Sequence, residues 1–333
     1  MKGFDFEEQR LESEISRSGA KRVLLQLPEG LKPEAMRLAK VVEKGGALPI
    51  ISADPCYGAC DIATDVAESL GANLVVHFGH ARFLAHEQIP TIYVETRSTV
   101  PICDAVEKAL PLLVKYVRVG LTTSLQHLQS LSQAREILTK AGKTVVVGDS
   151  GQLNYAGQVL GCNYSNVKSI ANEVDAFLFV GGGIFHALGV ALSSSKPTII
   201  ADPYENRAFS IEKEAQKIIK QRWASIEEAK KAKTFGIVIG MKPGQKKIDL
   251  ALKIKSMADK HGCAAYLLAA KEITPEELLE FPFIDAYVNT ACPRISLDAP
   301  SKFSKPVLNV NEFMVAVGES TWENTLKKGL FES

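Results

Sequence analysis

The amino-acid sequence predicts an α/β protein made of three similar lobes, each built on a parallel sheet. The chain has 333 residues, more than one hydrophobic core usually supports. Short apolar runs alternate along it with segments of helical period, the pattern of parallel sheets whose faces are covered by helices. The same order occurs three times, in units of about 90 to 100 residues. We therefore expect three lobes in a pseudo-threefold arrangement around a central site: 1–112, 113–205, and 206–333, the last with a linker helix.

Each lobe begins with a buried apolar run that predicts its first strand, and amphipathic segments predict the helices that follow. In the first lobe the predicted strands are 22–27, 47–51, 74–77 and 91–94, and the predicted helices are 33–44 and 62–70. In the second lobe the strands are 117–121, 144–147, 176–180 and 198–200, with helices at 125–141, at 166–173 and between the last two strands. In the third lobe the strands are 235–239, 264–267, 286–289 and 306–310, with a helix at 247–261.

Residues 204–233 are expected to link the second and third lobes. Glu and Lys alternate over 212–222 and 226–233, and pairs three and four residues apart favour a solvated helix. A docking surface for a protein partner is the alternative.

The composition argues against several classes of function. A formal net charge of +1 supplies no strong field for nucleic acid or for an anionic membrane. No stretch approaches the roughly 20 apolar residues of a membrane-spanning helix, and the acidic segment 1–8 lacks the apolar run of a signal peptide. We therefore expect a cytoplasmic protein. In that reducing compartment the six cysteines favour metal binding or catalysis over disulfides.

Three cysteines, one in each third of the chain, lie in turn-like settings just after predicted strands. They are Cys60, Cys162 and Cys292. Ligands of open parallel sheets bind at the carboxyl ends of the strands, so we expect the three thiolates to meet between the lobes. Three thiolates can hold an iron–sulfur cube and leave its fourth iron open. Zinc is less favoured because structural zinc sites use close ligand pairs and a filled tetrahedron; coincidence is the remaining alternative.

The other three cysteines have different expected roles. Cys56 and Cys60 form a C-x3-C pair; we favour Cys60 as the ligand because Gly58 and Ala59 give its backbone room. Cys56 is interpreted as a neighbouring thiol, with a reserve or redox role as the alternative. Cys103 and Cys263 have no companion, and packing is their expected role.

Several polar and glycine-rich segments at strand exits are candidate ligand contacts. Three successive glycines, Gly181, Gly182 and Gly183, allow backbone N–H groups to approach a carboxylate or a nucleoside, or simply make a turn. His80 and His186 follow comparable strands and are candidates for ligand contact or proton transfer, although single histidines are often structural.

Two further segments complete the candidate set. Residues 26–30 end the first strand with Gln26, Pro28, Glu29 and Gly30, which line the site or only make a rigid turn. In the third lobe Arg294 and Asp298 flank Cys292; Arg294 is suited to hold a carboxylate through two hydrogen bonds, and the alternative is that the two residues pair with each other.

Four segments in order resemble the family of archaeal diphthamide synthases that make 2-(3-amino-3-carboxypropyl)histidine. The segments are 25–30 (LQLPEG), 57–61 (YGACD), 160–165 (LGCNYS) and 291–296 (ACPRIS). The resemblance covers nearly the whole chain. Cys56 departs from members that have another residue type there, which leaves the first ligand less sharply defined.

The resemblance implies a homodimer in which Cys60, Cys162 and Cys292 bind a [4Fe-4S] cluster. It implies that the open iron binds S-adenosylmethionine and that an electron donor supplies the reduced cluster. The bond between sulfur and the γ-carbon of the methionine portion is then cleaved, methylthioadenosine leaves, and the 3-amino-3-carboxypropyl group is transferred. The acceptor is carbon 2 of a histidine imidazole in translation elongation factor 2. No catalytic residue beyond the cluster is identified.

Two other functions stay open on the sequence. A quinolinate synthase resembles the same three-lobed, three-cysteine plan but uses its open iron as a Lewis acid for dehydration. A non-catalytic electron-transfer or scaffold subunit is the second alternative, because paired forms of the family contain a supporting chain.

Overall fold

The computed structural model describes residues 3–298 and 300–330. Its sheets confirm the α/β prediction: three sheets are parallel throughout or nearly so. By contacts the chain divides into two compact units. Unit 1 runs to Pro101 and also contains Leu125–Gln129 and Lys242–Gly244, and unit 2 holds the other described residues from Ile102 on, including residues 102–112 of the predicted first lobe. The proposed lobe boundaries at 112 and 205 remain a prediction.

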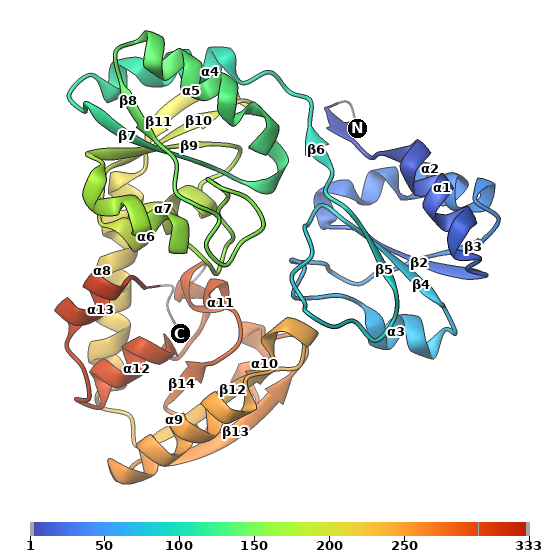
Figure 1. Ribbon diagram of the computed structural model, residues 1–333. Helices are drawn as coiled ribbons and strands as arrows, with labels where there is room; N and C mark the ends of the chain where they lie inside the picture. Colours follow the sequence, from blue (N-terminus) through green and yellow to red (C-terminus); the bar gives the residue numbers. More distant parts are fainter. Residues whose placement is uncertain (1–2, 299, 331–333) are drawn as a thin grey trace. The chain divides into compact units, whose positions relative to one another are not determined.

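Unit 1 contains a four-stranded parallel sheet in the order β3-β2-β4-β5 (Figure 1). Buried residues of α1 and α2 cover one face and α3 covers the other. A short antiparallel pair, β1 (Phe4–Asp5) with β6 (Arg97–Ser98), lies outside this sheet. The remaining elements are α1 (Glu8–Ser18), β2 (Arg22–Gln26), α2 (Ala35–Lys44), β3 (Leu48–Ile51), α3 (Thr64–Ser69), β4 (Leu74–Phe78) and β5 (Thr91–Val94).

The second-lobe sheet of unit 2 has five strands in the order β11-β10-β9-β7-β8. Helices α4 and α5 contribute to the core on one face, and α6, α7 and α8 contribute to the core on the other. The elements are α4 (Cys103–Ala109), β7 (Arg118–Thr123), α5 (Leu131–Lys140), β8 (Thr144–Val146), α6 (Ser165–Ile170), β9 (Ala176–Val180), α7 (Phe185–Ser194), β10 (Thr198–Asp202), β11 (Arg207–Ser210) and α8 (Glu212–Ala229).

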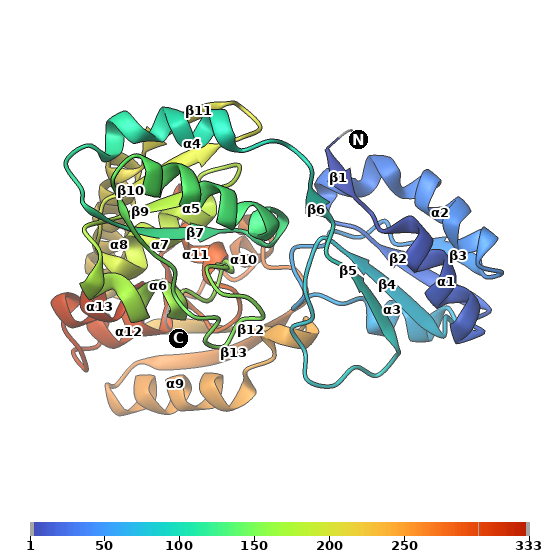
Figure 2. The same cartoon turned by 45° about the horizontal axis from the view of Figure 1, so that its top comes forward.

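The third-lobe sheet of unit 2 has four parallel strands in the order β13-β12-β14-β15. Figure 2 shows α9 running alongside β12 and β13. The elements are β12 (Thr234–Gly240), α9 (Ile248–Lys260), β13 (Ala264–Ala270), α10 (Pro275–Leu279), β14 (Ala286–Asn289), α11 (Pro293–Leu297), β15 (Val307–Asn309), α12 (Val310–Ala316) and α13 (Trp322–Lys328).

Two of the predicted helices begin as 3-10 helix. Residues Glu29–Glu34 form a 3-10 turn that contains Pro33, and the α-helix starts only at Ala35; proline lacks the N–H that an α-helix interior needs. In the same way Leu125–Ser130 is 3-10 helix before α5. The other 3-10 helices are Leu110–Leu113, Ala171–Glu173, Pro243–Gln245 and Pro300–Lys302.

The three lobes share a hydrogen-bonding motif that supports their description as repeats. The residue just before the third strand of each sheet accepts, on one side-chain oxygen, two backbone N–H groups at the start of the first strand. Asn73 accepts from Lys21 and Arg22, Asp175 from Val117 and Arg118, and Asp285 from Lys233 and Thr234. Distances are 2.8–3.2 Å, within the normal hydrogen-bond range. Each motif fixes the same strand crossover in its own lobe.

The expectation of a solvated linker over 204–233 is wrong in two respects. Residues 207–210 form β11, which extends the second-lobe sheet antiparallel to β10. Helix α8 then packs into two hydrophobic clusters of unit 2, through Ala215 in the cluster of the second-lobe sheet and Ile226 in the cluster of the third-lobe sheet. Its Arg222 is fully buried and pairs with Glu312 of α12, with Nε 2.7 Å from Oε1. The alternation of Glu and Lys in the sequence predicted an exposed helix and gave no sign of these buried positions.

None of the described helices is both long and apolar enough to cross a lipid bilayer.

Candidate functional site

In unit 1 Cys60 lies on the loop that follows β3, and several hydrogen bonds hold that loop in place. Lys32 Nζ donates to the carbonyls of Ala53 and Asp54 at 2.9 and 3.0 Å. Gln26, the last residue of β2, donates from Nε2 to the carbonyl of Asp61 at 2.6 Å. The loop is therefore tied at both ends to the carboxyl edge of the sheet, the position predicted for a ligand site.

A buried cation lies against this loop. Lys242 Nζ is 3.2 Å from Asp61 Oδ2 and 4.2 Å from the centre of the Tyr57 ring. The Lys242 and Asp61 residues are only 5% and 7% exposed. The Gly244 N–H donates to the Cys60 carbonyl at 2.8 Å, and a β-carbon on Gly244 would come within 2.6 Å of the Cys60 β-carbon. Only glycine allows this approach.

Cys56, four residues before Cys60, lies close to two histidines. His77 Nδ1 is 2.9 Å from Gln26 Oε1, and its Nε2 is 3.0 Å from His80 Nδ1. Burial lowers the pKa of His77 and lowers the pKa of His80 to about 4, so both imidazoles are neutral near pH 7. Burial, helped by the charge of Asp61, raises the pKa of the Cys56 thiol to about 12. Cys56 is therefore protonated in the metal-free chain, as expected of a packed thiol.

In unit 2 Cys162 occupies the tip of a tight turn. Leu160 and Asn163 exchange backbone hydrogen bonds at 2.9 and 3.2 Å, which leaves Gly161 and Cys162 at the tip. The Asn163 side chain accepts from the N–H of Ser165 at 3.0 Å. Cys162 is exposed, so its thiol is accessible to a ligand.

Cys292 follows β14 in the same unit. Asn289, the last residue of β14, accepts the N–H of Ala291 at 2.9 Å and donates Nδ2 to the Cys292 carbonyl at 2.7 Å. One amide side chain thus closes the turn between strand and helix. Proline at position 293 then begins α11, where its missing N–H costs nothing.

The Cys162 and Cys292 loops come together around two aromatic side chains. The Phe185 ring packs so closely on Gly161 that a β-carbon there would lie 2.5 Å from it, and the Arg294 guanidinium lies 4.2 Å from the centre of the same ring. Burial raises the pKa of the Tyr164 hydroxyl; the Cys162 thiol, Asp298 and Cys292 add to this effect, and Arg294 opposes it. Two of the three predicted ligands therefore share one region of unit 2.

The glycine-rich segment begins next to this region. Gly181 N–H donates to the Ala201 carbonyl at 3.0 Å, and Gly183, at φ +74°, directs its N–H toward Asp202 Oδ2 at 3.4 Å. The Tyr204 ring lies against Gly182. His186 stacks on Phe179 with ring centres 6.1 Å apart. Two of the backbone N–H groups that we expected to contact a ligand, those of Gly181 and Gly183, are thus directed at acceptors within the protein.

The remaining predicted contacts are also engaged within the protein. Both ends of the Gln26 amide are bonded, because Oε1 accepts the N–H of Ala63 at 3.1 Å. Glu29 pairs with Lys32 at 2.7 Å. Pro28 packs against Gly79, and Gly30 lies in the 3-10 turn. Arg294 pairs with Asp298 at 2.6 Å, the second of the two alternatives.

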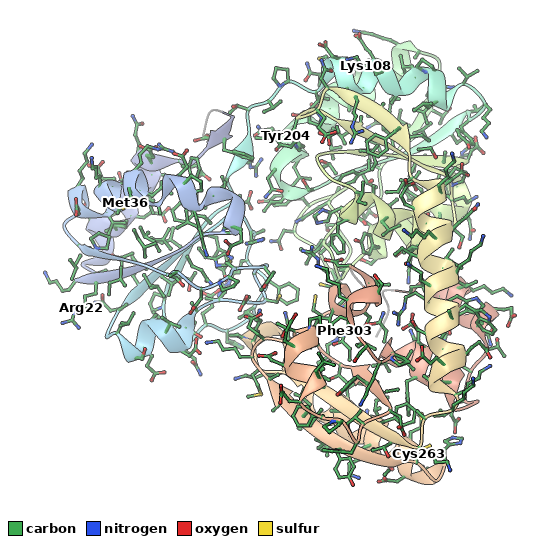
Figure 3. All side chains as sticks on the ribbon, turned by 180° about the vertical axis from the view of Figure 1, so that it is seen from behind. Arg22, Met36, Lys108, Tyr204, Cys263 and Phe303 are labelled. Carbon is green, nitrogen blue, oxygen red and sulfur yellow. The ribbon has the colours of Figure 1, made fainter. Side chains whose placement is uncertain are left out.

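Cys103 and Cys263 are not on the loops that follow β3, β8 and β14. Cys103 begins α4, and Cys263 precedes β13 at the amino end of that strand (Figure 3). Its Sγ is 3.8 Å from the Ala232 carbonyl. Cys263 is therefore not at the carboxyl edge where ligands of parallel sheets bind.

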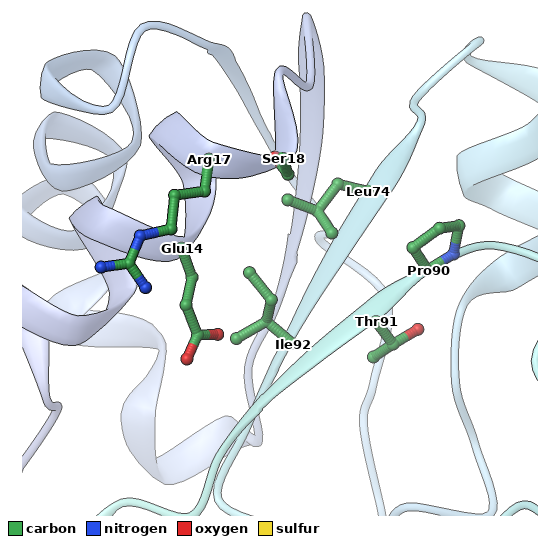
Figure 4. A pocket seen from close by; sticks show the side chains of 7 residues that line it. All are labelled: Glu14, Arg17, Ser18, Leu74, Pro90, Thr91 and Ile92. Carbon is green, nitrogen blue, oxygen red and sulfur yellow. The ribbon is translucent and has the colours of Figure 1, made fainter.

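A shallow pocket of about 380 Å³ in unit 1 also lies at the wrong edge (Figure 4). Leu74 and Thr91, which line it, are the first residues of β4 and β5. It is therefore at the amino ends of the strands, opposite the Cys60 loop.

The chemistry of the donor set fits an iron–sulfur cluster. Cys60, Cys162 and Cys292 are not part of disulfides and are partly or fully exposed, whereas Cys56 is buried. Thiolate is the usual protein ligand of such clusters.

Local patterns did not reveal several residues of the region. Lys242, Asn289, Tyr164 and Phe185 were missed. Lys242 follows the first strand of the third lobe in the segment KPG, as 28–30 (PEG) follows the first strand of the first lobe; this correspondence was the available signal.

Comparisons with known proteins agree with one another. The model of the diphthamide synthesis protein family matches residues 27–327. The chain is 38% identical over 307 residues to a 2-(3-amino-3-carboxypropyl)histidine synthase of Pyrococcus horikoshii, covering 92% of this chain and 88% of that protein. It is 28% identical to subunit 1 of the human protein of that name, covering 96% of this chain and 73% of the relative. A crystal structure of Dph2 from Pyrococcus horikoshii with a 4Fe-4S cluster superposes with a TM-score of 0.88 at 34% identity, over 96% of this chain and 92% of that one.

Proposed function

Because the chain belongs to the diphthamide synthesis protein family, we propose that it is a 2-(3-amino-3-carboxypropyl)histidine synthase and acts in the first step of diphthamide biosynthesis. One observation carries the proposal: each of the three lobes has a cysteine that is outside disulfides, at least partly exposed and in a loop after a strand of its sheet, in a chain similar over nearly its whole length to a protein with a 4Fe-4S cluster.

The cofactor is a [4Fe-4S] cluster held by Cys60, Cys162 and Cys292. Support comes from the shared surroundings of Cys162 and Cys292 around Phe185 and Tyr164. The Cys60 loop has the same relation to its own sheet. With three protein thiolates, one iron stays open for a co-substrate.

The co-substrate is S-adenosylmethionine, and the acceptor is carbon 2 of a histidine imidazole in translation elongation factor 2. When bound, the reduced cluster supplies one electron, which cleaves the bond between sulfur and the γ-carbon. Methylthioadenosine would leave and the 3-amino-3-carboxypropyl group would bond to carbon 2, which would then release a proton to solvent and return one electron to the oxidised cluster, so that the transfer is redox-neutral overall. An external reductant primes the reaction.

The chain's own residues are proposed to bind and orient the co-substrate. The Gly181–Gly183 backbone, His186 and the Arg294–Asp298 pair are proposed to contact the co-substrate from unit 2, where Arg294 already lies by Phe185. From unit 1, residues 26–30 and His80 are likewise proposed to contact the co-substrate. Gln26 contributes by holding Asp61, next to Cys60.

We further propose that two copies assemble into a homodimer in the cytoplasm. The Pyrococcus relative is named as a synthase without a subunit number, whereas the more distant human relative is named subunit 1. The chain would then need no second kind of subunit. Mass measurement in solution would test this by giving twice the 36.2 kDa of one chain.

The reaction is tested with anaerobically reconstituted protein, dithionite, S-adenosylmethionine and elongation factor 2. The expected nucleoside product is methylthioadenosine, together with a factor modified on one histidine. Release of 5′-deoxyadenosine would refute the choice of bond. If neither nucleoside is released, the result would favour the non-catalytic alternative. Family membership removes the quinolinate synthase alternative.

The ligand assignment is tested by single replacements. Cys60→Ala, Cys162→Ala and Cys292→Ala are each expected to lower the iron bound per chain and abolish turnover. Cys103→Ala and Cys263→Ala are the matched controls and should retain iron. Equal losses from all five variants would overturn the assignment.

A further inference from the structure

A second group of metal-binding atoms lies in unit 1 and does not include Cys60. The Cys56 sulfur and one ring nitrogen each of His77 and His80 all lie within 4.8 Å of one another. Among the residues that the structure describes, these three form the one group of His, Cys, Asp or Glu side chains spaced closely enough to hold a metal ion. Cys56 is 4% exposed and His77 is 0% exposed, so two of the three are held by the core.

The hydrogen bonds around His77 define its tautomer. Gln26 Oε1 accepts the N–H of Ala63, while Gln26 Nε2 donates to the Asp61 carbonyl, so the orientation of this amide is fixed. His77 Nδ1, 2.9 Å from Oε1, must therefore carry the proton. Its Nε2 lone pair then points away from Gln26, toward His80. A hydrogen-bonded partner of this kind orients the histidine ligands of metal sites.

The spacing of the two nitrogens also suits a metal. His77 Nε2 and His80 Nδ1 are 3.0 Å apart. In a tetrahedral zinc site with Zn–N bonds of about 2.0–2.1 Å, two nitrogens lie roughly 3.4 Å apart. A shift of a few tenths of an ångström converts the present hydrogen bond into two metal bonds, once the proton of His80 Nδ1 has moved through solvent to Nε2 of the same ring.

We propose that Cys56, His77 and His80 form a mononuclear site for a divalent transition metal of the zinc class. His77 binds through Nε2, His80 through Nδ1 and Cys56 through its sulfur, whose proton is released to solvent as the metal binds, and the fourth position is left for water. Sulfur and imidazole donors select zinc-like ions over magnesium or calcium. The site is distinct from the cluster because it uses other ligands and requires no inorganic sulfide.

The site would have a mechanical consequence for the neighbouring cysteine. Cys56 is on the loop after β3, His77 is in β4, and His80 follows the end of β4. A metal bound by all three cross-links that loop to the adjacent strand. Cys60, four residues after Cys56, is then held by the metal as well as by Gln26.

The test uses the full-length chain with Cys60, Cys162 and Cys292 all replaced by Ala, which removes the proposed cluster ligands. This variant is freed of metal and titrated with Co²⁺. The expected result is one Co²⁺ per chain, with a sulfur-to-cobalt charge-transfer band and the ligand-field bands of a tetrahedral site; Zn²⁺ should displace it. Absence of the charge-transfer band in a chain with an intact circular dichroism spectrum would overturn the proposal.

Two further substitutions in this background separate metal binding from folding. His80→Asn keeps an N–H donor for His77 but has no imidazole lone pair, so Co²⁺ affinity should fall by more than about tenfold, since even loss of an outer partner costs 10–100-fold. Cys56→Ser should abolish the charge-transfer band. Cys263→Ser is the control and should leave it unchanged. Persistence of the band in Cys56→Ser would assign it to another thiol.

If the triple variant does not fold, the same question can be answered with the wild-type protein carrying its cluster. Zinc-edge X-ray absorption is expected to show one sulfur and two imidazoles around bound zinc. Two results would contradict the site: a zinc coordination shell without sulfur, or a Cys56→Ser variant that retains all of its zinc.

Discussion

At the scale of single residues, the Cys60 loop depends on a charge that local sequence patterns did not identify. Lys242 reaches Asp61 from a segment about 180 positions away. Both residues are buried, and removing one partner of a buried ion pair typically costs about 3–5 kcal/mol. The ion pair therefore acts on the position of Cys60 through its neighbour Asp61.

Replacement of this cation tests its role. Lys242→Met is expected to lower both the free energy of unfolding and the iron retained after anaerobic gel filtration, because Asp61 loses its nearest positive charge. Lys246→Met, an exposed position four residues along, is the matched control. Unchanged iron content in Lys242→Met would show that the ion pair does not position Cys60.

A second buried charge joins three elements of unit 2. Arg222 of α8 donates to Glu312 of α12, to the carbonyl of Ser296 in α11 at 2.9 Å and to that of Val307 in β15 at 2.7 Å. Arg222→Met leaves Glu312 buried without this cation and should destabilise unit 2 by about 3–5 kcal/mol.

Tryptophan fluorescence during chemical denaturation measures this loss. The chain has only two tryptophans, Trp223 and Trp322, whose ring centres are 5.6 Å apart. Trp223 follows Arg222 in α8, and Trp322 begins α13. Arg207→Met, which removes an exposed pair with Glu205, should change stability little, since exposed ion pairs contribute about 0–1 kcal/mol. Equal effects of the two substitutions would refute the importance of burial.

At the scale of elements, the motif of Asn73, Asp175 and Asp285 makes a prediction about interchangeability. Lobe one uses Asn where lobes two and three use Asp, so the motif needs an acceptor oxygen and not a charge. Asp175→Asn should nearly retain the stability of unit 2, whereas Asp175→Ala should lower it because two strand-initial N–H groups lose their acceptor.

The same carboxylate predicts a pH dependence. Hydrogen bonds from the backbone N–H groups of Arg118 and Val117 lower the pKa of Asp175 below its ordinary value of 3.8. A lowered folded-state pKa contributes stability that is complete above the unfolded pKa and is lost as pH falls through the folded pKa. The denaturation midpoint of Asp175→Asn should therefore fall less in acid than that of the wild type; parallel curves would contradict this.

Elements with strong local signals were predictable from the sequence. The strands at 91–94, 176–180 and 286–289 have the predicted bounds, because strands covered on both faces read as unbroken apolar runs. Strand β11 was missed because RAFS is short and its pairing with β10 comes from the sheet. The partly buried nature of α8 was missed because Arg222 counts as polar in any periodic pattern.

At the scale of the molecule, the sequence predicted three α/β lobes but not the contacts that cross between lobes. Residues 125–129 and 242–244 belong to unit 1 although their neighbours along the chain belong to unit 2. Such contacts depend on tertiary packing, which no local pattern encodes. For the same reason Tyr164 and Phe185, beside Cys162 and Cys292, were not predicted, whereas the cysteines themselves were.

The central claim is that three cysteines hold one cluster whose remaining iron binds S-adenosylmethionine. Mössbauer spectroscopy of the protein reconstituted with ⁵⁷Fe tests it most directly. Addition of S-adenosylmethionine is expected to change the isomer shift of one iron out of four while the other three keep values typical of sulfur ligation. Four irons that all remain cysteine-like and unaffected by S-adenosylmethionine would contradict the account.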